Sequence, residues 1–238
     1  MSNWGKGAKN NTINWGQGAC DNTIGWGTSQ KDNNSWSGET DISGCSTGLA
    51  QIDNAYSMQF DGTGTEQIYI PPYTIPENST VSFWVKSSLT NPSDVIISGG
   101  NTNVGHYYPF LLLSGGNIKL LVKSGSTANG VTTDVPWAAN TWFHIAISGA
   151  NGAGSGSTAT FYINGINKGT SLNRTPTLSV IGNYSTSSLA WNGNIDEVAF
   201  FDTVLTDAEI LSIYNATTTG KTADLSQLTT PPVAWYRM

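Results

Sequence analysis

Short apolar runs that alternate with polar residues fill the chain from Leu49 onward, and each run stops at turn-forming residues. In STVSFWVKSS at residues 79–88, Val81, Phe83 and Val85 share one face of an extended chain and predict a core-facing strand. The 27 Gly and 9 Pro, with only 11% charged residues, disfavour helices. The sequence therefore predicts an all-β fold, a two-sheet antiparallel sandwich.

Glycine-rich turns predict how neighbouring strands connect. SGGN at residues 114–117 separates apolar runs at residues 110–113 and 118–122, and Asn164-Gly165 interrupts a similar pair of runs. Asn-Gly is a strong hairpin signal because both residues tolerate a positive φ. Both sites are predicted to be hairpins between adjacent antiparallel strands.

The segment GNIDEVAFFDTVLTDAEILSIYN at residues 193–215 combines a strand with a short helix. Its residues 194–201 alternate with apolar side chains on both faces towards the end, which predicts a strand covered on both sides. Thr206 and Glu209 have the spacing of a capping box, and Leu205 and Ile210 flank it as a hydrophobic staple would. The sequence thus predicts one short C-terminal helix that packs on the sandwich.

Residues 1–48 follow a different pattern, in which Trp4, Trp15 and Trp26 are equally spaced and Trp36 follows one residue early. Each repeat buries little surface by itself, so it must stack on its neighbours, on other copies of the chain or on a partner. One interpretation is a disordered low-complexity leader. The favoured one is a docking and oligomerisation arm, because disordered segments are usually poor in aromatic residues.

Charge and cysteine usage exclude several classes of protein. A formal net charge of −6 and ten scattered basic residues argue against a nucleic-acid surface. The sequence has neither a membrane span nor the apolar core of a secretory signal at its start, so we expect synthesis in a host cytosol. Cys20 and Cys45 are then expected to be reduced thiols, and their spacing does not match a zinc site.

Five stretches along the chain occur in an order that is typical of one family. They are FDG at residues 60–62, SFWVK at 82–86, Trp-x-His-x-Ala at 142–146, FYINGINKG at 161–169 and the strand–turn–helix segment at 193–215. Over about residues 50–216 the chain resembles LamG-like, concanavalin A-like jelly-roll domains. The resemblance implies two curved antiparallel sheets packed face to face, with the short helix outside them, and often glycan or protein binding. The tryptophan-rich arm resembles leader repeats in virion proteins of tailed bacteriophages.

The resemblance also implies a structural calcium ion where the FDG strand end and the strand with Asp196 come together. Asp61 and Asp196 are the residues that would match, because calcium prefers carboxylate and carbonyl oxygens. The alternative is that Asp61 only forms a turn and that Asp196 is a surface carboxylate or bonds to a neighbouring loop. No other cofactor is expected.

Catalysis is not expected, although relatives of this fold include glycoside hydrolases and polysaccharide lyases. A retaining hydrolase needs two carboxyl groups ~5 Å apart. Asp196 and Glu197 are adjacent, and strict alternation along a strand would point them to opposite faces. No Glu-x-Asp-x-x-Glu run is present. The sequence therefore predicts a protein without catalytic residues.

Aromatic side chains in turn-rich segments are the candidates for glycan contacts, because the faces of their rings bind sugars. An aromatic residue near a strand end also commonly belongs to the rim of the core, which is the alternative for each of them. The candidates are Tyr107, Tyr108, Trp137, Tyr184 and Trp191.

Together these features predict a non-enzymatic virion structural protein: a decoration protein, or part of a fibre or of a neck or tail appendage. The arm at 1–48 would dock it to other virion proteins and to copies of itself, as a trimer. The jelly roll at 49–216 would contact host surface polysaccharide. Residues 217–238 would be a linker and the start of a further strand or domain, although that strand could equally pair back onto the sandwich. The alternative is a free carbohydrate-binding lectin, and neither a nucleic-acid nor a membrane partner is expected.

Overall fold

The structure is a computed structural model that describes residues 49–100, 105–150, 157–184 and 189–238. Within it, Leu49–Met238 forms one compact unit. The predictions for the N-terminal arm and for the two cysteines concern residues outside the described ranges, namely Trp4, Trp15, Trp26, Trp36, Cys20 and Cys45.

The described residues form short β-strands, an α-helix and a turn of 3-10 helix. The first elements are β1 (Gln51–Asp53), β2 (Met58–Asp61), β3 (Ile68–Thr74), β4 (Ser79–Lys86), β5 (Asp94–Val95), β6 (Ile97–Ser98), β7 (Tyr107–Ser114), β8 (Asn117–Ser124) and β9 (Thr127–Pro136). The later ones are β10 (Phe143–Ala150), β11 (Thr158–Ile163), β12 (Ile166–Leu172), β13 (Thr177–Ile181), β14 (Asn192–Phe201), α1 (Asp207–Ala216), β15 (Lys221–Ala223), η4 (Leu225–Gln227) and β16 (Ala234–Tyr236). The all-β class predicted from the sequence is confirmed.

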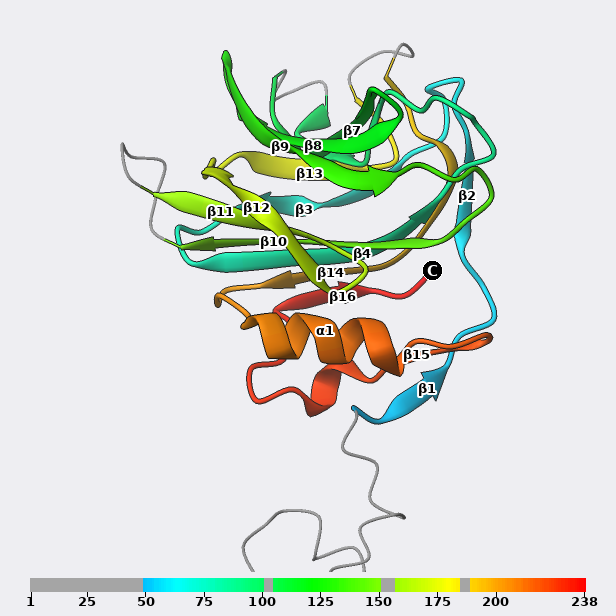
Figure 1. Cartoon of the computed structure of the whole chain (residues 1–238), viewed down its shortest axis with the longest axis vertical. Coiled ribbons are helices and arrows are strands. Elements are labelled where there is room, and N and C mark those ends of the chain that lie inside the picture. Colours follow the sequence, from blue (N-terminus) through cyan, green and yellow to red (C-terminus); the bar gives the residue numbers. More distant parts are fainter. Residues whose placement is uncertain (1–48, 101–104, 151–156, 185–188) are drawn as a thin grey trace, which may run out of the picture. The chain divides into compact units, whose positions relative to one another are not determined.

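Two seven-stranded antiparallel sheets make the sandwich, and Figure 1 shows them as two stacked layers. Sheet I has the strand order β12-β11-β10-β4-β14-β16, with β2 also paired to β14. Sheet II has the order β3-β13-β6-β7-β8-β9, with β5 also paired to β7. The predicted hairpins are present, β7–β8 around Gly115-Gly116 and β11–β12 around Asn164-Gly165, whose φ angles are 52° and 76°.

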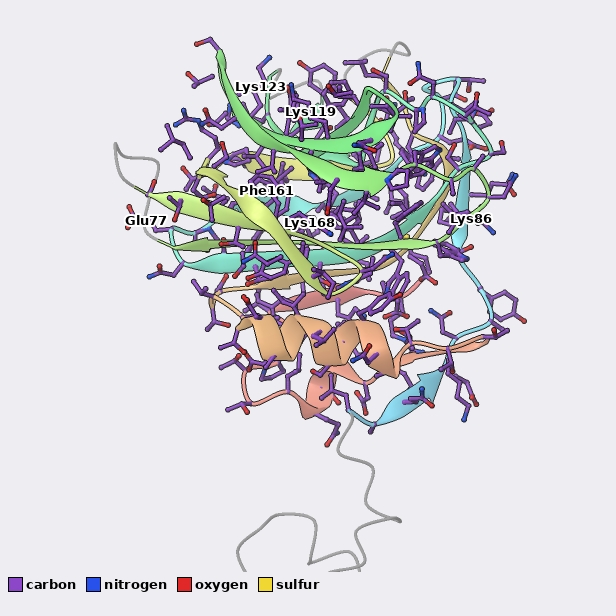
Figure 2. All side chains as sticks on the ribbon, in the orientation of Figure 1. Glu77, Lys86, Lys119, Lys123, Phe161 and Lys168 are labelled. Carbon is purple, nitrogen blue, oxygen red and sulfur yellow. The ribbon has the colours of Figure 1, made fainter. Side chains whose placement is uncertain are left out.

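The main core lies between the two sheets, where Phe161 points in Figure 2. The predicted inner face of β4 is correct, since Val81, Phe83 and Val85 are all fully buried there. A second apolar cluster lies on the outer side of sheet I, where Phe201 packs with helix residues. Sheet I is therefore covered on both faces.

Helix α1 lies on the outer side of sheet I, and the predicted cap is present (Figure 1). The side chain of Thr206 accepts a hydrogen bond from Glu209 N, and the Glu209 carboxylate accepts one from Thr206 N. The helix buries Ile210 and Ile213, whereas Leu211 is exposed. Within the described residues, no helix is long and apolar enough to cross a membrane.

Residues 217–238, expected to be a linker leading into a strand, return to the sandwich. Strand β15 pairs with β1, and β16 pairs with the second half of β14, with Val198 opposite Tyr236. Strand β2 pairs with the first half of β14, with Ile195 opposite Met58. One edge of β14 is therefore shared by two short strands that are far apart in the sequence.

A β-bulge interrupts β14 between these two halves. The register with β4 shifts between Asp196 and Ala199, and Glu197 has a φ of 53°. The alternation expected for residues 194–201 is therefore wrong beyond Asp196. Ile195 and Val198 both contact the core between the sheets, whereas Ala199 belongs to the cluster under α1. The two residues between Ile195 and Val198 are thus free to point together towards the outer side.

Candidate functional site

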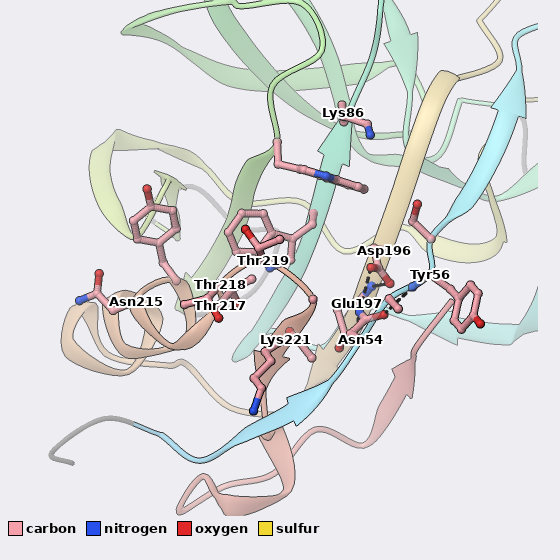
Figure 3. Close-up of a pocket in the computed structure, with 17 residues that line it drawn as sticks. Asn54, Tyr56, Lys86, Asp196, Glu197, Asn215, Thr217, Thr218, Thr219 and Lys221 are labelled. Carbon is pink, nitrogen blue, oxygen red and sulfur yellow. Dashed lines mark hydrogen bonds between the residues drawn. The ribbon is translucent and has the colours of Figure 1, made fainter. Parts of the chain in front are cut away.

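A pocket of about 830 Å³ opens on the outer side of sheet I, beside the C-terminal end of α1 (Figure 3). Strands β4 and β14, the residue before β10, the segment before β2 and the chain that leaves α1 all contribute to it. Its lining includes Trp84, Trp142, Tyr214, Tyr56 and Lys86, the carboxylates of Asp196 and Glu197, and residues 217–222. The pocket therefore combines aromatic rings with carboxylate, amide and ammonium groups.

The pairing register of the strands in sheet I determines which residues form the floor of this pocket. Trp84 on β4 lies opposite His144 on β10 and opposite Asp196 on β14, so the three form one row across the outer face. In the next row, Lys86 lies opposite Asn194, and Trp142 directly precedes β10. Side chains from three strands that are distant in the sequence thus meet because neighbouring strands align their residues across a sheet.

Three aromatic rings of the pocket are half-buried and packed in two groups. Trp84 stacks on Tyr214 of α1, with 5.8 Å between ring centroids and an interplanar angle of 19°. The Nζ atom of Lys86 lies 4.9 Å from the ring centroid of Trp142. Tyr56, which is 82% exposed, lies at the rim. Trp142 therefore has a ring face that a flexible lysine side chain covers.

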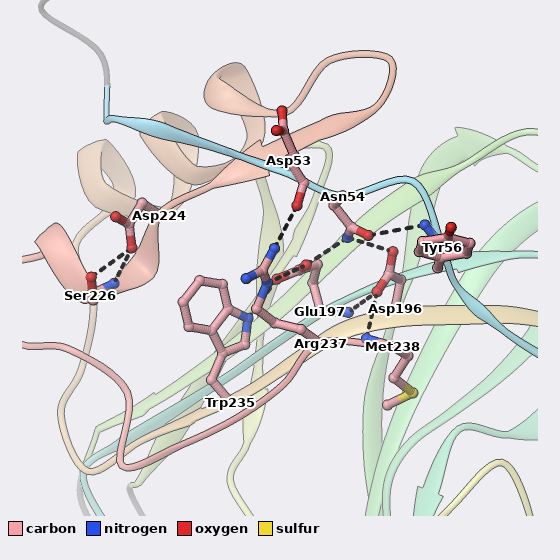
Figure 4. A network of polar contacts seen from close by, with 10 residues as sticks. All are labelled: Asp53, Asn54, Tyr56, Asp196, Glu197, Asp224, Ser226, Trp235, Arg237 and Met238. Atoms are coloured by element: carbon pink, nitrogen blue, oxygen red, sulfur yellow. Dashed lines mark hydrogen bonds and ion pairs between the residues drawn. The ribbon is translucent and has the colours of Figure 1, made fainter.

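The bulge in β14 turns both acidic side chains towards one group. Asn54 Nδ2 donates to Asp196 Oδ2 at 2.9 Å and to Glu197 Oε1 at 2.6 Å (Figure 4). The expectation that the adjacent acids point to opposite faces is therefore wrong, because it assumed an unbroken strand. Two buried carboxyl groups lie together at one wall of the pocket.

Residues after β14, together with the backbone of Glu197 itself, supply the other donors to this carboxylate pair. Trp235 Nε1 donates to Glu197 Oε2 at 2.5 Å, and Arg237 Nε lies 3.6 Å from Glu197 Oε1. Asp196 Oδ1 accepts from Glu197 N at 2.8 Å and from Met238 N at 3.3 Å. Each of the four carboxylate oxygens therefore has at least one protein donor (Figure 4).

Burial shifts the protonation of the carboxylate pair. Loss of water, followed by repulsion from Asp196, raises the pKa of Glu197 to about 7. Burial also raises the pKa of Asp196, although its hydrogen bonds oppose that shift. Near neutral pH the pair consequently carries less than two full negative charges.

His144 lies at the other end of the row that contains Trp84. It is fully buried, its Nε2 is 2.8 Å from Ser82 Oγ, and among the described residues its Nδ1 has no hydrogen-bond partner. Burial lowers the pKa of His144 to about 3, so the ring is neutral at physiological pH.

The two predicted calcium ligands do not meet. Asp61 lies opposite Asn192 in the β2–β14 pair, and Asp196 is four residues further along β14. That separation is about 13 Å along a strand, so the two carboxylates cannot share one ion. Asp61 Oδ1 instead accepts hydrogen bonds from the backbone and hydroxyl of Thr63, as a turn-forming residue does. Among the described residues, no group of three or more His, Cys, Asp or Glu could hold a metal ion.

The predicted glycan contacts lie outside this pocket and do not form one surface. Tyr107, Tyr108 and Trp191 are buried, so they offer no open ring face to a sugar. Trp137 is half-buried, stacks on Phe143 and donates from Nε1 to the carbonyl of Leu89 at 2.8 Å. Tyr184 accepts at its hydroxyl from Gly105 N. For the three buried residues the alternative, a place in the core, describes the structure better, whereas for Trp137 and Tyr184 the glycan contact stays a prediction.

The site residues predicted from the sequence did not include Trp84, Trp142 or Tyr214. The signal was present in the alternation, because Trp84 and Lys86 occupy the face of their strand that Val81, Phe83 and Val85 do not. Alternation within one strand does not give the register between strands that brings β4, β10 and β14 together.

The comparisons with known proteins agree with this architecture. The family described as the Concanavalin A-like lectin/glucanases superfamily matches residues 60–211, so the chain belongs to that family. No curated protein matches the sequence.

Two solved structures illustrate how widely the fold occurs. A heptameric SAP-like pentraxin from Limulus polyphemus is 16% identical, with a TM-score of 0.53, and the match covers 66% of this chain and 80% of the pentraxin. Domain 4 of a GH43 extracellular arabinanase from Geobacillus stearothermophilus, solved with arabinotriose, is 19% identical, with a TM-score of 0.50 and coverage of 68% and 79%. At such identities the likeness concerns the fold.

Proposed function

We propose that this chain is a non-catalytic carbohydrate-binding protein and that the pocket on the outer side of sheet I is its glycan site. The observation that carries the proposal is the half-buried ring of Trp142 in an open pocket that also contains Trp84, Tyr214 and several hydroxyl and amide groups. Sugar rings combine apolar C–H faces with equatorial hydroxyls, and a site of this mixed composition suits both. Membership in a family of lectins and glucanases supports the same class of ligand.

The carboxylate pair supports binding rather than hydrolysis. A catalytic acid must present its proton to the substrate, and a nucleophile must present a free oxygen. Here the oxygens of Asp196 and Glu197 accept hydrogen bonds from Asn54, Trp235 and the backbone of Met238. The pair therefore holds three segments of the chain together, and we infer no catalytic role for it.

Substitution of Trp142 tests the glycan site. We expect the full chain to bind a subset of an array of bacterial capsular, O-antigen and plant cell-wall oligosaccharides, and Trp142→Ala to weaken that binding by about tenfold through lost stacking. Tyr69→Ala is the matched control, since Tyr69 is 73% exposed on β3 of the other sheet. Equal binding by wild type and Trp142→Ala, or no binding to any glycan by wild type, would contradict the proposal.

We further propose that residues 1–48 dock this sandwich to a virion, where it would contact host surface polysaccharide as a structural component. The regular spacing of Trp4, Trp15 and Trp26 supports this role, since a repeat that cannot bury its own tryptophans gains stability from partner copies. We expect the full chain to form trimers and a variant lacking residues 3–46 to be monomeric by light scattering. The same number of chains per particle in both proteins would overturn the docking role and leave a free lectin as the better description.

A further inference from the structure

The charged side chains in the pocket differ in how many hydrogen-bond and ion-pair partners they already have within the protein. The charged residues that line it are Asp196, Glu197, Lys86 and Lys221. Each oxygen of the two acids accepts at least one protein hydrogen bond, so protein donors already compensate much of their negative charge. The two lysines differ from the acids, because among the described residues neither ammonium group has a carboxylate closer than 4.0 Å.

Lys86 is held by an aromatic ring rather than by an acid. Its Nζ lies 4.9 Å from the ring centroid of Trp142, and among the described residues no carboxylate lies within 4.0 Å of it. A cation–π contact is weaker than a charge-assisted hydrogen bond and leaves all three ammonium protons available. Lys86 can therefore turn to an anion without breaking an ion pair.

Lys221 provides a second cation at some distance from Lys86. Figure 3 shows Lys86 and Lys221 at opposite ends of the pocket, with Asp196 and Glu197 to one side between them. The Lys221 side chain is 51% exposed, and its ammonium group only approaches Asp53 Oδ1, at 4.0 Å. Such an exposed ion pair stabilises the protein little, so Lys221 can also bind an anion at little cost.

We propose that the pocket selects acidic glycans, with one sugar ring on Trp142, its carboxylate or sulfate group on Lys86, and Lys221 reaching a second anionic group. This selectivity rests on the proposed glycan site. The whole chain carries a formal charge of −6, so its long-range field repels anions and the preference arises from these local contacts. An acidic sugar suits the lysine–indole pair, because its apolar face can stack on the indole while its anionic group accepts hydrogen bonds from the ammonium group beside that ring.

Binding of matched acidic and neutral sugars to the full chain tests this selectivity. The carboxylate probes are trigalacturonic acid and its methyl ester, and the sulfate probes are dextran sulfate and dextran, all measured by calorimetry at one ionic strength. We expect at least one acidic probe to bind about tenfold or more tightly than its neutral partner. Lys86→Met should remove most of that preference, because Met is a long, unbranched side chain of similar reach that carries no charge. Lys221→Met should reduce the preference less.

Lys119→Met is the control for general charge effects, since Lys119 is half-buried on sheet II (Figure 2). Equal binding of acidic and neutral probes, or an equal loss in Lys86→Met and Lys119→Met, would overturn the selectivity. If acidic selectivity fails while Trp142→Ala still weakens binding to neutral sugars, the glycan site itself remains supported. If Trp142→Ala changes nothing for any probe, the site is wrong and the selectivity with it.

Discussion

Two buried titratable sites lie on either side of Trp84 in sheet I, the Asp196–Glu197 pair on β14 and His144 on β10, and burial shifts them in opposite directions. On β14, burial raises the pKa of Glu197 to about 7, whereas on β10 it lowers the pKa of His144 to about 3. In both cases loss of water disfavours the charged form, which is the anion for glutamate and the cation for histidine. The same physical cause therefore makes the folded protein bind an extra proton at one site and release one at the other.

This opposition determines how stability depends on pH. Glu197 has a folded pKa above its unfolded value of about 4.5, so its contribution is fully present below pH 4.5 and is lost as the pH rises through 7. His144 has a folded pKa below 6.5, so its contribution is present above pH 6.5 and is lost as the pH falls towards 3. Between about pH 4.5 and 6.5 the two slopes oppose each other. Asp94 and Asp196, whose pKa values burial also raises, act in the same direction as Glu197.

Glu197→Gln has the largest expected effect on this balance. Glutamine keeps the length of the side chain and its acceptor for Trp235 Nε1, but it does not titrate. We expect the variant to lose the glutamate slope, which is on the order of 3 kcal/mol between pH 4.5 and 7 for a group shifted this far. Urea unfolding at pH 4.5, 5.5, 6.5 and 7.5 measures it. A variant whose slope matched that of wild type would show that Glu197 ionises normally in the folded protein.

His144→Gln is expected to have a somewhat smaller effect in the opposite direction. The variant removes the group that must stay neutral, so acidification from pH 6.5 to 4.5 should change its free energy of unfolding by about 2–3 kcal/mol in the stabilising direction relative to wild type. The same unfolding series measures it. An acid limb identical to that of wild type would mean that His144 is protonated in the folded state.

Thr206→Ala serves as the matched control for both variants. It removes the helix cap, which costs about 1 kcal/mol, and it introduces no titratable group. We expect a uniform loss across the pH series, so a change of slope in this variant would mean that the slopes report general loosening of the sandwich.

The local elements were predictable from the sequence because local chemistry determines them. The inner face of β4 follows from alternation, and the start of α1 follows from the spacing of Thr206 and Glu209. The hairpin at Asn164-Gly165 follows from the tolerance of those residues for positive φ. In each case the determining residues lie within a few positions of one another.

The pocket was not predictable from the sequence, because the residues that form it lie far apart along the chain. Its floor depends on the alignment of Trp84, Trp142 and Asp196 from three strands, and alternation within one strand gives no register between strands. The bulge at Glu197 was hidden as well, because glutamate is not a residue type that favours positive φ. Polar composition made residues 217–238 resemble a linker, whereas their few apolar and aromatic side chains, such as Trp235, complete the sheet edge.

The shared edge of β14 also implies an order of assembly. Trp235 reaches Glu197 across 38 residues of chain, whereas Asn54 reaches Asp196 across 142. Closing the longer loop costs about 1.2 kcal/mol more entropy. We therefore expect β16 to join β14 early, and β1 and β2 to arrive last and to open first in native-state hydrogen exchange. The hydrogen bonds to the carboxylate pair would then form in two stages, the one from Trp235 to Glu197 before the one from Asn54 to Asp196.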